Sequence, residues 1–247
     1  SINSLINNSY VNKKARYKFL NVDLYDYQKT QKAINESKPD IIFHLAAESH
    51  VDSSILNPSI FVQSNINGTF NLLESAKNFY NTLGESKKNS FRFHHISTDE
   101  VYGSLDINGY FNEQSQYKPN SPYSASKAAS DHLVMAWNKT FKLPTLITNC
   151  SNNYGPWQHA EKLIPKTIKN ALSGEKIPLY GNGENIRDWL YVEDHIDALL
   201  IVAQRGTIGE SYCIGGNSEL KNKDILLKIC NLLNEIVPNK RKYSSLI

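Results

Sequence analysis

The chain has 247 residues, of which 40% are hydrophobic, 11% aromatic and 21% charged, and its formal net charge at pH 7 is +3. These values are close to those of globular proteins, so we expect one or two domains with a substantial buried core. No stretch is apolar for long enough to cross a bilayer, and the first residues have no apolar signal segment, which argues against a membrane or secreted protein. We therefore expect a cytoplasmic protein, and the evenly spread charge argues against nucleic-acid binding.

The three cysteines do not indicate a metal site. Cys150, Cys213 and Cys230 are odd in number, far apart and without the spacing of metal ligands. We predict three buried free thiols.

The first half of the chain alternates short apolar runs with helical patterns. One helical pattern ends near residues 38–40, and a polar loop is expected at Asn81–Ser90. The expected strands are Ile41–Leu45, Phe91–Ser97 and Thr145–Asn149, and the expected helices are Pro58–Tyr80 and Ser124–Phe141. Strands that alternate with helices predict an α/β fold with a Rossmann-like, doubly wound parallel sheet.

From Asn152 onward this alternation stops. The turn-rich sequences NNYGPW and GNGENIRDW separate two helical patterns, Glu161–Leu172 and Val192–Gln204. The pattern at Asn222–Val237 is amphipathic at helical spacing, with Asn222 near its N-cap position. We therefore predict a sheet domain at residues 1–151 and a smaller, mainly substrate-binding region at residues 152–247.

Tyr123 and Lys127 form a Y-S-A-S-K sequence within a predicted helix. Residues at i and i+4 lie on the same helix face, so the ammonium group would lie beside the phenol. A neighbouring positive charge favours the phenolate, and a Tyr so placed can act as a base near neutral pH. The alternative is an ordinary surface helix, because this spacing is common by chance.

Two adjacent acids follow the predicted strand Phe91–Ser97, in the sequence STDEVYG. Asp99 and Glu100, with Thr98, would lie at the carboxyl end of that strand, where an open α/β sheet presents groups to ligands. Elimination of water needs an acid for the leaving hydroxyl and a base for the carbon-bound proton. The alternative is that one acid caps a helix or a turn.

Further motifs occur in order along nearly the whole chain. They are HLAAESHVD at His44–Asp52, STDEVYG, YSASKAASDHLV, NCSNNYGP at Asn149–Pro156, EKLIP, and RDWLYVEDH at Arg187–His195. This set resembles the extended short-chain dehydrogenase/reductase superfamily, and within it the dTDP-glucose 4,6-dehydratases. Related epimerases and decarboxylases share the Tyr and the Lys but usually lack the consecutive acids after the Thr, so Asp99 and Glu100 favour a dehydratase.

The resemblance implies an NAD-dependent lyase that acts on a nucleotide sugar. Tyr123 would take the C4 hydroxyl proton during oxidation at C4, and Thr98 would steady the C4 oxygen. Glu100 would then remove the C5 proton, and Asp99 would protonate the leaving C6 hydroxyl before hydride returns to C6. Lys127 completes the catalytic set that the resemblance implies.

The resemblance also assigns ligand positions and a partner. It assigns NAD to the domain at residues 1–151, and the cofactor positions that it implies are Asp23, Leu24, Leu45, Ala46, Ala47, Ser49, Ser64, Tyr123 and Lys127, together with Asn153 just beyond that domain. It assigns the nucleotide sugar to Ser49, Thr98, Asn152, Lys162, Leu163, Pro178, Tyr180, Arg187 and Asn222. Lys162 and Arg187 could bind a diphosphate, and Tyr180 could pack on the base. It further implies a homodimer through a four-helix interface.

Each of these positions has a simpler interpretation. Small residues after a strand are also typical of strand-end packing, and Arg187 beside Asp188 could be a plain ion pair. The family has Thr where this chain has Ser64. No metal site is implied.

The G-x-x-G-x-x-G turn of the family does not occur in this sequence. We therefore expect a fold without its first β-α-β unit, and without a later R-x-x-R-Y segment at the other end. Either these residues are part of a longer chain, or the protein is short and binds NAD poorly. The functional alternatives are another nucleotide-sugar dehydratase, an epimerase or decarboxylase of the superfamily, or a non-catalytic binding or dimerisation relative.

Overall fold

The computed structural model describes residues 17–105, 109–179 and 181–247, which divide into two compact units. The first, which we call the sheet unit, comprises Lys18–Cys150 and Ile196–Ile214. The second unit comprises Tyr17, Ser151–His195 and Gly215–Ile247. A single boundary after residue 151 therefore does not describe the compact units. The assignment of the two sequence regions to NAD and to substrate stays a prediction.

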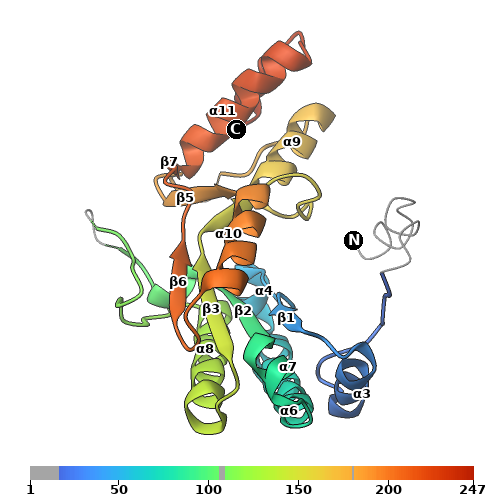
Figure 1. The fold of residues 1–247 in the computed structure, drawn as a ribbon. Helices are drawn as coiled ribbons and strands as arrows, with labels where there is room; N and C mark the ends of the chain where they lie inside the picture. The colour runs from blue at the N-terminus through green and yellow to red at the C-terminus, as the bar shows by residue number, and fades with distance from the viewer. Residues whose placement is uncertain (1–16, 106–108, 180) are drawn as a thin grey trace. The chain divides into compact units, whose positions relative to one another are not determined.

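The sheet unit is built on four parallel strands (Figure 1). They are β1 (Ile41–His44), β2 (Arg92–Thr98), β3 (Thr145–Cys150) and β6 (Ser211–Ile214), in the order β1-β2-β3-β6. All six residues of β3 are buried, as expected for a strand covered on both faces. This sheet confirms the predicted parallel α/β class. The sequence did not predict β6, whose pairing with β3 returns residues 196–214 to the sheet unit.

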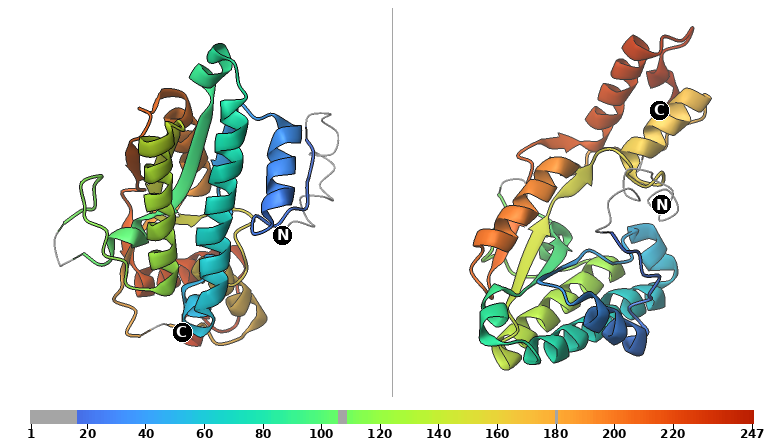
Figure 2. Two further views of the ribbon diagram at one scale, coloured as in Figure 1. Left: turned by 90° about the horizontal axis from the view of Figure 1, so that it is seen from below. Right: turned by 45° about the vertical axis from the view of Figure 1, so that its right-hand side comes forward.

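Helices cover both faces of this sheet. The helices α3 (Tyr27–Ser37), α6 (Gly68–Asn81) and α8 (Pro122–Phe141) lie side by side on one face (Figure 2, left). Residues Ile196–Arg205 of α10 (Val192–Arg205) run along the opposite face. The hydrophobic core between the sheet and the first helix layer includes the buried residues Leu72, Leu73, Ala76, Phe79, Phe91, Phe93, Val134, Leu143 and Ile147. This layering is that of a doubly wound fold.

The helix expected at Pro58–Tyr80 contains a π-helical segment. It consists of α5 (Pro58–Phe61), the π-helical residues Val62–Asn67, and α6. Inside the π segment Asn65 is buried, and its amide bonds both backbone groups of Glu48 and the Ser126 hydroxyl. Single-turn π segments are frequent at functional sites, because the extra residue re-aims a side chain.

Two short helices were not predicted. They are α4 (Val51–Leu56) and α7 (Glu85–Ser90), the latter within the polar loop that the sequence predicted. No residue of α7 is buried, so an apolar periodicity could not mark it.

The second unit contains a three-stranded sheet and two main helices. β4 (Asn152–Tyr154) runs parallel to β5 (Ile186–Tyr191), which pairs antiparallel with β7 (Glu219–Lys221). The helices α9 (Leu163–Ser173) and α11 (Asn222–Ile236) and the 3-10 turn Tyr243–Leu246 share a core, formed by Ala171, Ile177, Leu226, Cys230, Leu233 and Tyr243. The N-cap of α11 is Lys221, so Asn222 is its first helical residue.

The cysteines and the helices bear on two sequence expectations. All three cysteines are free, but only Cys150 and Cys230 are buried, whereas Cys213 is half-buried beside Tyr102.

Across residues 17–105, 109–179 and 181–247 no helix combines the length and apolarity that a membrane span requires. The same residues contain no group of three potential metal ligands. The cytoplasmic location stays a prediction.

Candidate active site

The end of β2 carries the three adjacent polar residues of the STDEVYG motif. β2 stops at Thr98, and Asp99–Tyr102 form a 3-10 turn. The Thr98 hydroxyl accepts a hydrogen bond from the Glu100 backbone N–H at 3.3 Å and donates one to Asp99 Oδ1 at 3.3 Å. Thr98 therefore caps the turn, and neither acid is its N-cap.

Gly103 closes this turn for a steric reason. Its φ of +88° is in the left-handed region, and a Cβ there would lie 2.4 Å from the Lys118 carbonyl oxygen. Lys118 in turn donates its backbone N–H to the Val101 carbonyl at 2.9 Å. The loop before α8 is thereby bound to the turn that carries the acids.

Tyr123 lies in the first turn of α8, next to these residues. Ser121 and Ser124 form a capping box, and Pro122 is the first helical residue, so the start of α8 is well defined. Burial raises the pKa of Tyr123, and the charge of Glu100 raises this pKa further, whereas a hydrogen bond with Thr98 lowers it. The structure thus brings the Tyr123 phenol together with Thr98 and Glu100, and with Asp99, whose charge also acts on it.

Lys127 is buried one helical turn after Tyr123. Its Nζ donates to the Ile96 carbonyl of β2 at 2.8 Å and lies 3.5 Å from His95 Nε2. Burial lowers the pKa of Lys127, and the charge of Asp131 opposes this shift. In the described residues the Lys127 ammonium bonds the β2 backbone and not the Tyr123 phenol, and its stabilisation of a phenolate stays a prediction.

The loop after β1 places small side chains at the carboxyl end of the sheet. Leu45 is 59% exposed, Ala46 and Ser49 are exposed, and Ala47 is half-buried. The loop backbone is nevertheless held, because Asn65 bonds the N–H of Glu48 at 2.8 Å and its carbonyl at 3.0 Å. An apolar side chain this exposed does not serve strand-end packing, so the loop is accessible to a ligand.

Asp23, Leu24 and Ser64 also belong to the sheet unit. Asp23 is exposed and its carboxylate accepts the Tyr25 backbone N–H at 2.9 Å, whereas Leu24 is half-buried against the core. Leu24 lies close to Gly68, where the π segment that contains the half-buried Ser64 ends. Leu24 and the π segment are therefore neighbours in space.

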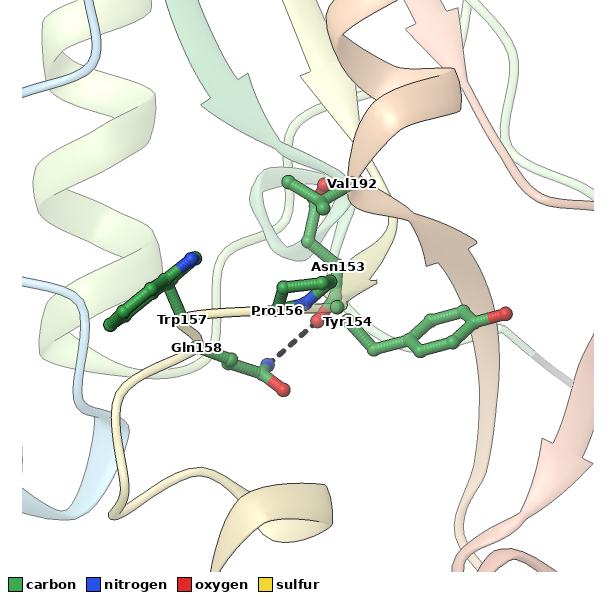
Figure 3. Close-up of a pocket in the computed structure, with 7 residues that line it drawn as sticks. Asn153, Tyr154, Pro156, Trp157, Gln158 and Val192 are labelled. Carbon is green, nitrogen blue, oxygen red and sulfur yellow. Dashed lines mark hydrogen bonds between the residues drawn. The ribbon is translucent and has the colours of Figure 1, made fainter. Parts of the chain in front are cut away.

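Asn153 is the centre of a small hydrogen-bonded group in the second unit. His195 Nδ1 donates to Asn153 Oδ1 at 2.7 Å, and the Asn153 amide donates to the Ser151 carbonyl at 3.1 Å. Gln158 bonds the Asn153 carbonyl at 2.8 Å across a shallow pocket of about 190 Å³ (Figure 3). His195 is buried, which lowers its pKa, so it bonds Asn153 as a neutral imidazole. No role was predicted for His195, although the residue ends the RDWLYVEDH motif.

The predicted substrate positions in the second unit lie at the starts of helices, on β4 and β5, and after α9. Lys162 is the N-cap of α9 and Leu163 its first residue, while Asn152 is on β4, Asn222 begins α11 and Pro178 is half-buried after α9. Tyr180 lies outside the described residues.

Arg187 does not form the ion pair that the sequence left open. The carboxylate of Asp188 accepts the backbone N–H groups of Gly216 at 2.6 Å and Ser218 at 2.7 Å. Neighbouring residues on a strand point to opposite faces, and the exposed Arg187 bonds the carbonyl of Ile186 at 3.2 Å. The guanidinium therefore remains accessible to a ligand.

Comparison with known proteins places this arrangement in a family. The family model described as GDP-mannose 4,6 dehydratase matches residues 1–246. The dTDP-glucose 4,6-dehydratase of Haemophilus influenzae is 55% identical over 231 residues, which cover 93% of this chain and 68% of that protein. The chain belongs to the NAD-dependent epimerase/dehydratase family, among its dTDP-glucose 4,6-dehydratases.

Solved structures of this family agree with the fold. A double mutant of a dTDP-glucose 4,6-dehydratase from Streptomyces venezuelae, with NAD and DAU bound, has a TM-score of 0.84 at 40% identity and covers 91% of this chain and 66% of that one. A Bacillus anthracis dTDP-glucose 4,6-dehydratase in complex with NAD has a TM-score of 0.82 at 40% identity, covering 96% and 70%. The chain spans about two thirds of the length of these members of the family.

Proposed function

We propose that this protein is an NAD-dependent lyase that converts dTDP-glucose to dTDP-4-keto-6-deoxyglucose. The observation that carries the proposal is the acid turn at the end of β2, where Asp99 and Glu100 follow Thr98 and are close enough to Tyr123 for their charges to raise its pKa. An epimerase needs a base beside C4, whereas removal of water across C5 and C6 also needs an acid and a second base. The two carboxyl groups supply both.

The residues act in sequence on the sugar. Tyr123 takes the proton of the C4 hydroxyl, and the Thr98 hydroxyl donates a hydrogen bond to the C4 oxygen. The resulting C4 carbonyl acidifies the C5 proton, which Glu100 removes. Asp99 protonates the C6 oxygen, which leaves as water. When hydride is added at C6, Glu100 returns a proton to C5. Tyr123 then loses the proton that it took from the C4 hydroxyl, and Asp99 regains one, both by exchange with solvent before the next turnover.

Tyr123 needs help to act as a base, since burial and Glu100 hold it protonated. When bound, oxidised NAD would supply the hydride acceptor and donor for C4 and C6, and its positive ring charge would favour the phenolate. Lys127 adds a second buried positive charge one turn away. We therefore place the deprotonation of Tyr123 after cofactor binding.

The residues of the sheet unit fit this cofactor. The exposed Leu45 offers an apolar surface to a flat ring, and the small Ala46 and Ala47 allow close backbone approach. Asn65 fixes the backbone of this loop through Glu48. The residues that would hold NAD are Asp23, Leu24, Leu45, Ala46, Ala47, Ser49, Ser64, Tyr123, Lys127 and Asn153.

The second unit would bind the nucleotide diphosphate. Arg187 is exposed and bonds only a neighbouring carbonyl among the described residues, so its guanidinium can bind phosphate oxygens in a bidentate way. Lys162 at the start of α9 adds a second positive charge. The other positions would be Ser49, Thr98, Asn152, Leu163, Pro178, Tyr180 and Asn222.

A homodimer would form through α6 and α8. Phe70 on α6 and Phe141 on α8 are 42% and 43% exposed, and both contact the ring of Trp137. Such an aromatic group at the surface of two adjacent helices is typical of an interface, here with the same helices of a second copy. Sedimentation tests this: Phe70→Glu should give monomers at micromolar protein, whereas the control Leu172→Glu should not.

One assay tests the activity. The protein is incubated with NAD and either dTDP-glucose, GDP-mannose or UDP-glucose, and mass spectrometry detects the loss of one water from the sugar nucleotide. Product from dTDP-glucose supports the proposal. Product from GDP-mannose alone would mean that GDP-mannose, and not dTDP-glucose, is the substrate. The match to the GDP-mannose 4,6 dehydratase family is the reason to include this sugar nucleotide. Epimerised sugar without loss of water, or no reaction with any of the three, would refute a dehydratase.

A further inference from the structure

The most connected buried charge of the sheet unit is Asp131, two turns after Tyr123 on α8. Its side chain is fully buried. Asp131 Oδ2 accepts hydrogen bonds from the Ser97 hydroxyl at 2.8 Å, the Tyr117 phenol at 2.9 Å and the Asn149 amide at 3.2 Å. His95 Nε2 lies 3.2 Å from the other carboxylate oxygen.

The three donors come from three different segments. Ser97 is on β2 immediately before Thr98, Asn149 is at the end of β3, and Tyr117 is in the loop before α8. The Asn149 amide also donates to the Thr98 carbonyl at 3.3 Å. Asp131 therefore holds the residues on both sides of the point where the acid turn begins.

Lys127 depends on the same carboxylate. It precedes Asp131 by one turn, and its Nζ is fixed by the Ile96 carbonyl and lies 3.5 Å from His95 Nε2. Burial lowers the pKa of Lys127, and among the groups that oppose this shift Asp131 is the strongest. Asp131 thus supports the charge of Lys127 as well as the position of β2.

A buried carboxylate costs free energy even when it is paired, so stability alone is a weak reason for one here. Each of its contacts leads to a segment that carries a proposed reactive residue. We propose that Asp131 is a positioning residue that holds the Thr98–Asp99–Glu100 turn in register with Tyr123 and Lys127. This inference rests on the proposed function for the roles of those residues, but the hydrogen bonds that it invokes do not.

The proposal predicts a local effect of losing the carboxylate. Asp131→Asn keeps the size of the side chain but removes the charge and one acceptor, and the new amide faces the donors of Asn149 and His95. The acid turn would then move relative to Tyr123, and displacements of about 1 Å can lower a rate by about 10²-fold. We expect kcat to fall by about 10²-fold while KM for the sugar nucleotide stays within about threefold.

Amide hydrogen exchange provides a readout that does not need turnover. In Asp131→Asn we expect residues 97–102 to exchange about tenfold faster or more, with α6 unchanged. The matched control is Ser130→Ala, the neighbouring fully buried residue, whose hydroxyl bonds Asn65 and Ser126 carbonyls and not the strand ends. It should leave the exchange of residues 97–102 as in the unaltered protein.

A second variant covers the case in which Asp131→Asn does not fold. Tyr117→Phe removes one donor and keeps the ring contacts with Tyr102 and His132. It should change kcat and the exchange of residues 97–102 in the same direction as Asp131→Asn, but by a smaller factor.

Three outcomes would each overturn the proposal. They are equal acceleration of exchange throughout the sheet unit, unchanged exchange at residues 97–102, and a local change in exchange with unchanged kcat. If the unaltered protein makes no product, the proposed function fails, and the exchange data still decide whether Asp131 holds the turn.

Discussion

The proposed reactive residues of the sheet unit and the proposed diphosphate ligand Arg187 of the second unit differ in how they are held. In the sheet unit Thr98, Lys127 and Asp131 are each held by defined bonds to β2, β3 or the 3-10 turn, and Lys127 and Asp131 are buried. In the second unit the proposed substrate ligand Arg187 is exposed and bonds only the carbonyl of Ile186 among the described residues.

This difference corresponds to two functions, proton transfer and ligand binding. Proton transfer requires donors and acceptors that are already in place, because small displacements cost large factors in rate. Binding of a charged, flexible nucleotide sugar tolerates side chains that order themselves on the ligand, at some cost in affinity. Changes in the sheet unit should therefore lower kcat, and changes in the second unit should raise KM.

Tyr123→Phe should give the largest effect. Without the phenol no group takes the C4 hydroxyl proton, so the first hydride transfer should slow by about 10³–10⁴-fold and no reduced cofactor should form. Stopped-flow absorbance of the reduced nicotinamide measures this step in a single turnover. Tyr80→Phe, a tyrosine of α6 that packs on Phe91, is the control and should react normally. Reduced cofactor at the usual rate in Tyr123→Phe would exclude Tyr123 as the base.

Glu100→Gln and Asp99→Asn should separate the half-reactions. Both variants keep the size of the side chain, so NAD and sugar nucleotide should still bind and C4 should still be oxidised. Loss of water should slow by about 10²-fold or more, and reduced cofactor should accumulate before product forms. Product analysis beside the absorbance trace tests this, with the exposed Glu36→Gln as control. If the Glu100 variant makes product at the normal rate, Glu100 is not the base at C5.

The buried His95 should make the stability of the sheet unit fall in mild acid. Burial, and then the charge of Lys127, lowers its pKa from 6.5 to about 4, although Asp131 opposes the shift. The unfolded chain therefore binds more protons than the folded one between about pH 6.5 and 4, and this residue can remove up to about 3 kcal/mol as the pH falls through that range. Urea unfolding at several pH values should show a smaller loss for His95→Gln than for the exposed control His159→Gln. An equal loss of unfolding free energy with falling pH in the two variants would contradict this prediction.

Arg187→Ala should have the smallest effect on chemistry and a clear effect on binding. Loss of a charged hydrogen bond to a diphosphate is worth about 1.5–3 kcal/mol, which corresponds to a rise in KM of about tenfold to 10²-fold. We expect kcat to change by less than about threefold in steady-state kinetics, with Arg241→Ala, another arginine of the second unit, as control. A fall in kcat at unchanged KM would instead give Arg187 a role in the chemistry and end the contrast between the two units.

Much of the fold and of the candidate site could be predicted from local sequence. Strands β1, β2 and β3 were marked by apolar runs, and α8 by its periodicity, each within about two residues of the observed ends. The acids at positions 99 and 100 were placed correctly at a strand end, because the carboxyl end of a parallel strand is defined by where its apolar run stops. The strands β4, β5, β6 and β7 were missed. Three of them have only three or four residues, which carry no measurable alternation and are stabilised by their partners, and the six-residue β5 begins within the sequence GNGENIRDW, which was interpreted as turn-rich.

The sequence by itself determined the fold class, the order of the main elements and the residue types that the chemistry needs. Only the tertiary structure decided what those residues bond. Lys127 is four residues from Tyr123, yet its ammonium bonds the Ile96 carbonyl of β2 and not the phenol. Asp131 accepts hydrogen bonds from Ser97, Tyr117 and Asn149. His195 bonds the side chain of Asn153, which is 42 residues away in the chain. Such contacts join segments far apart in the chain, and they form because burial leaves each polar group only those partners that packing brings within reach.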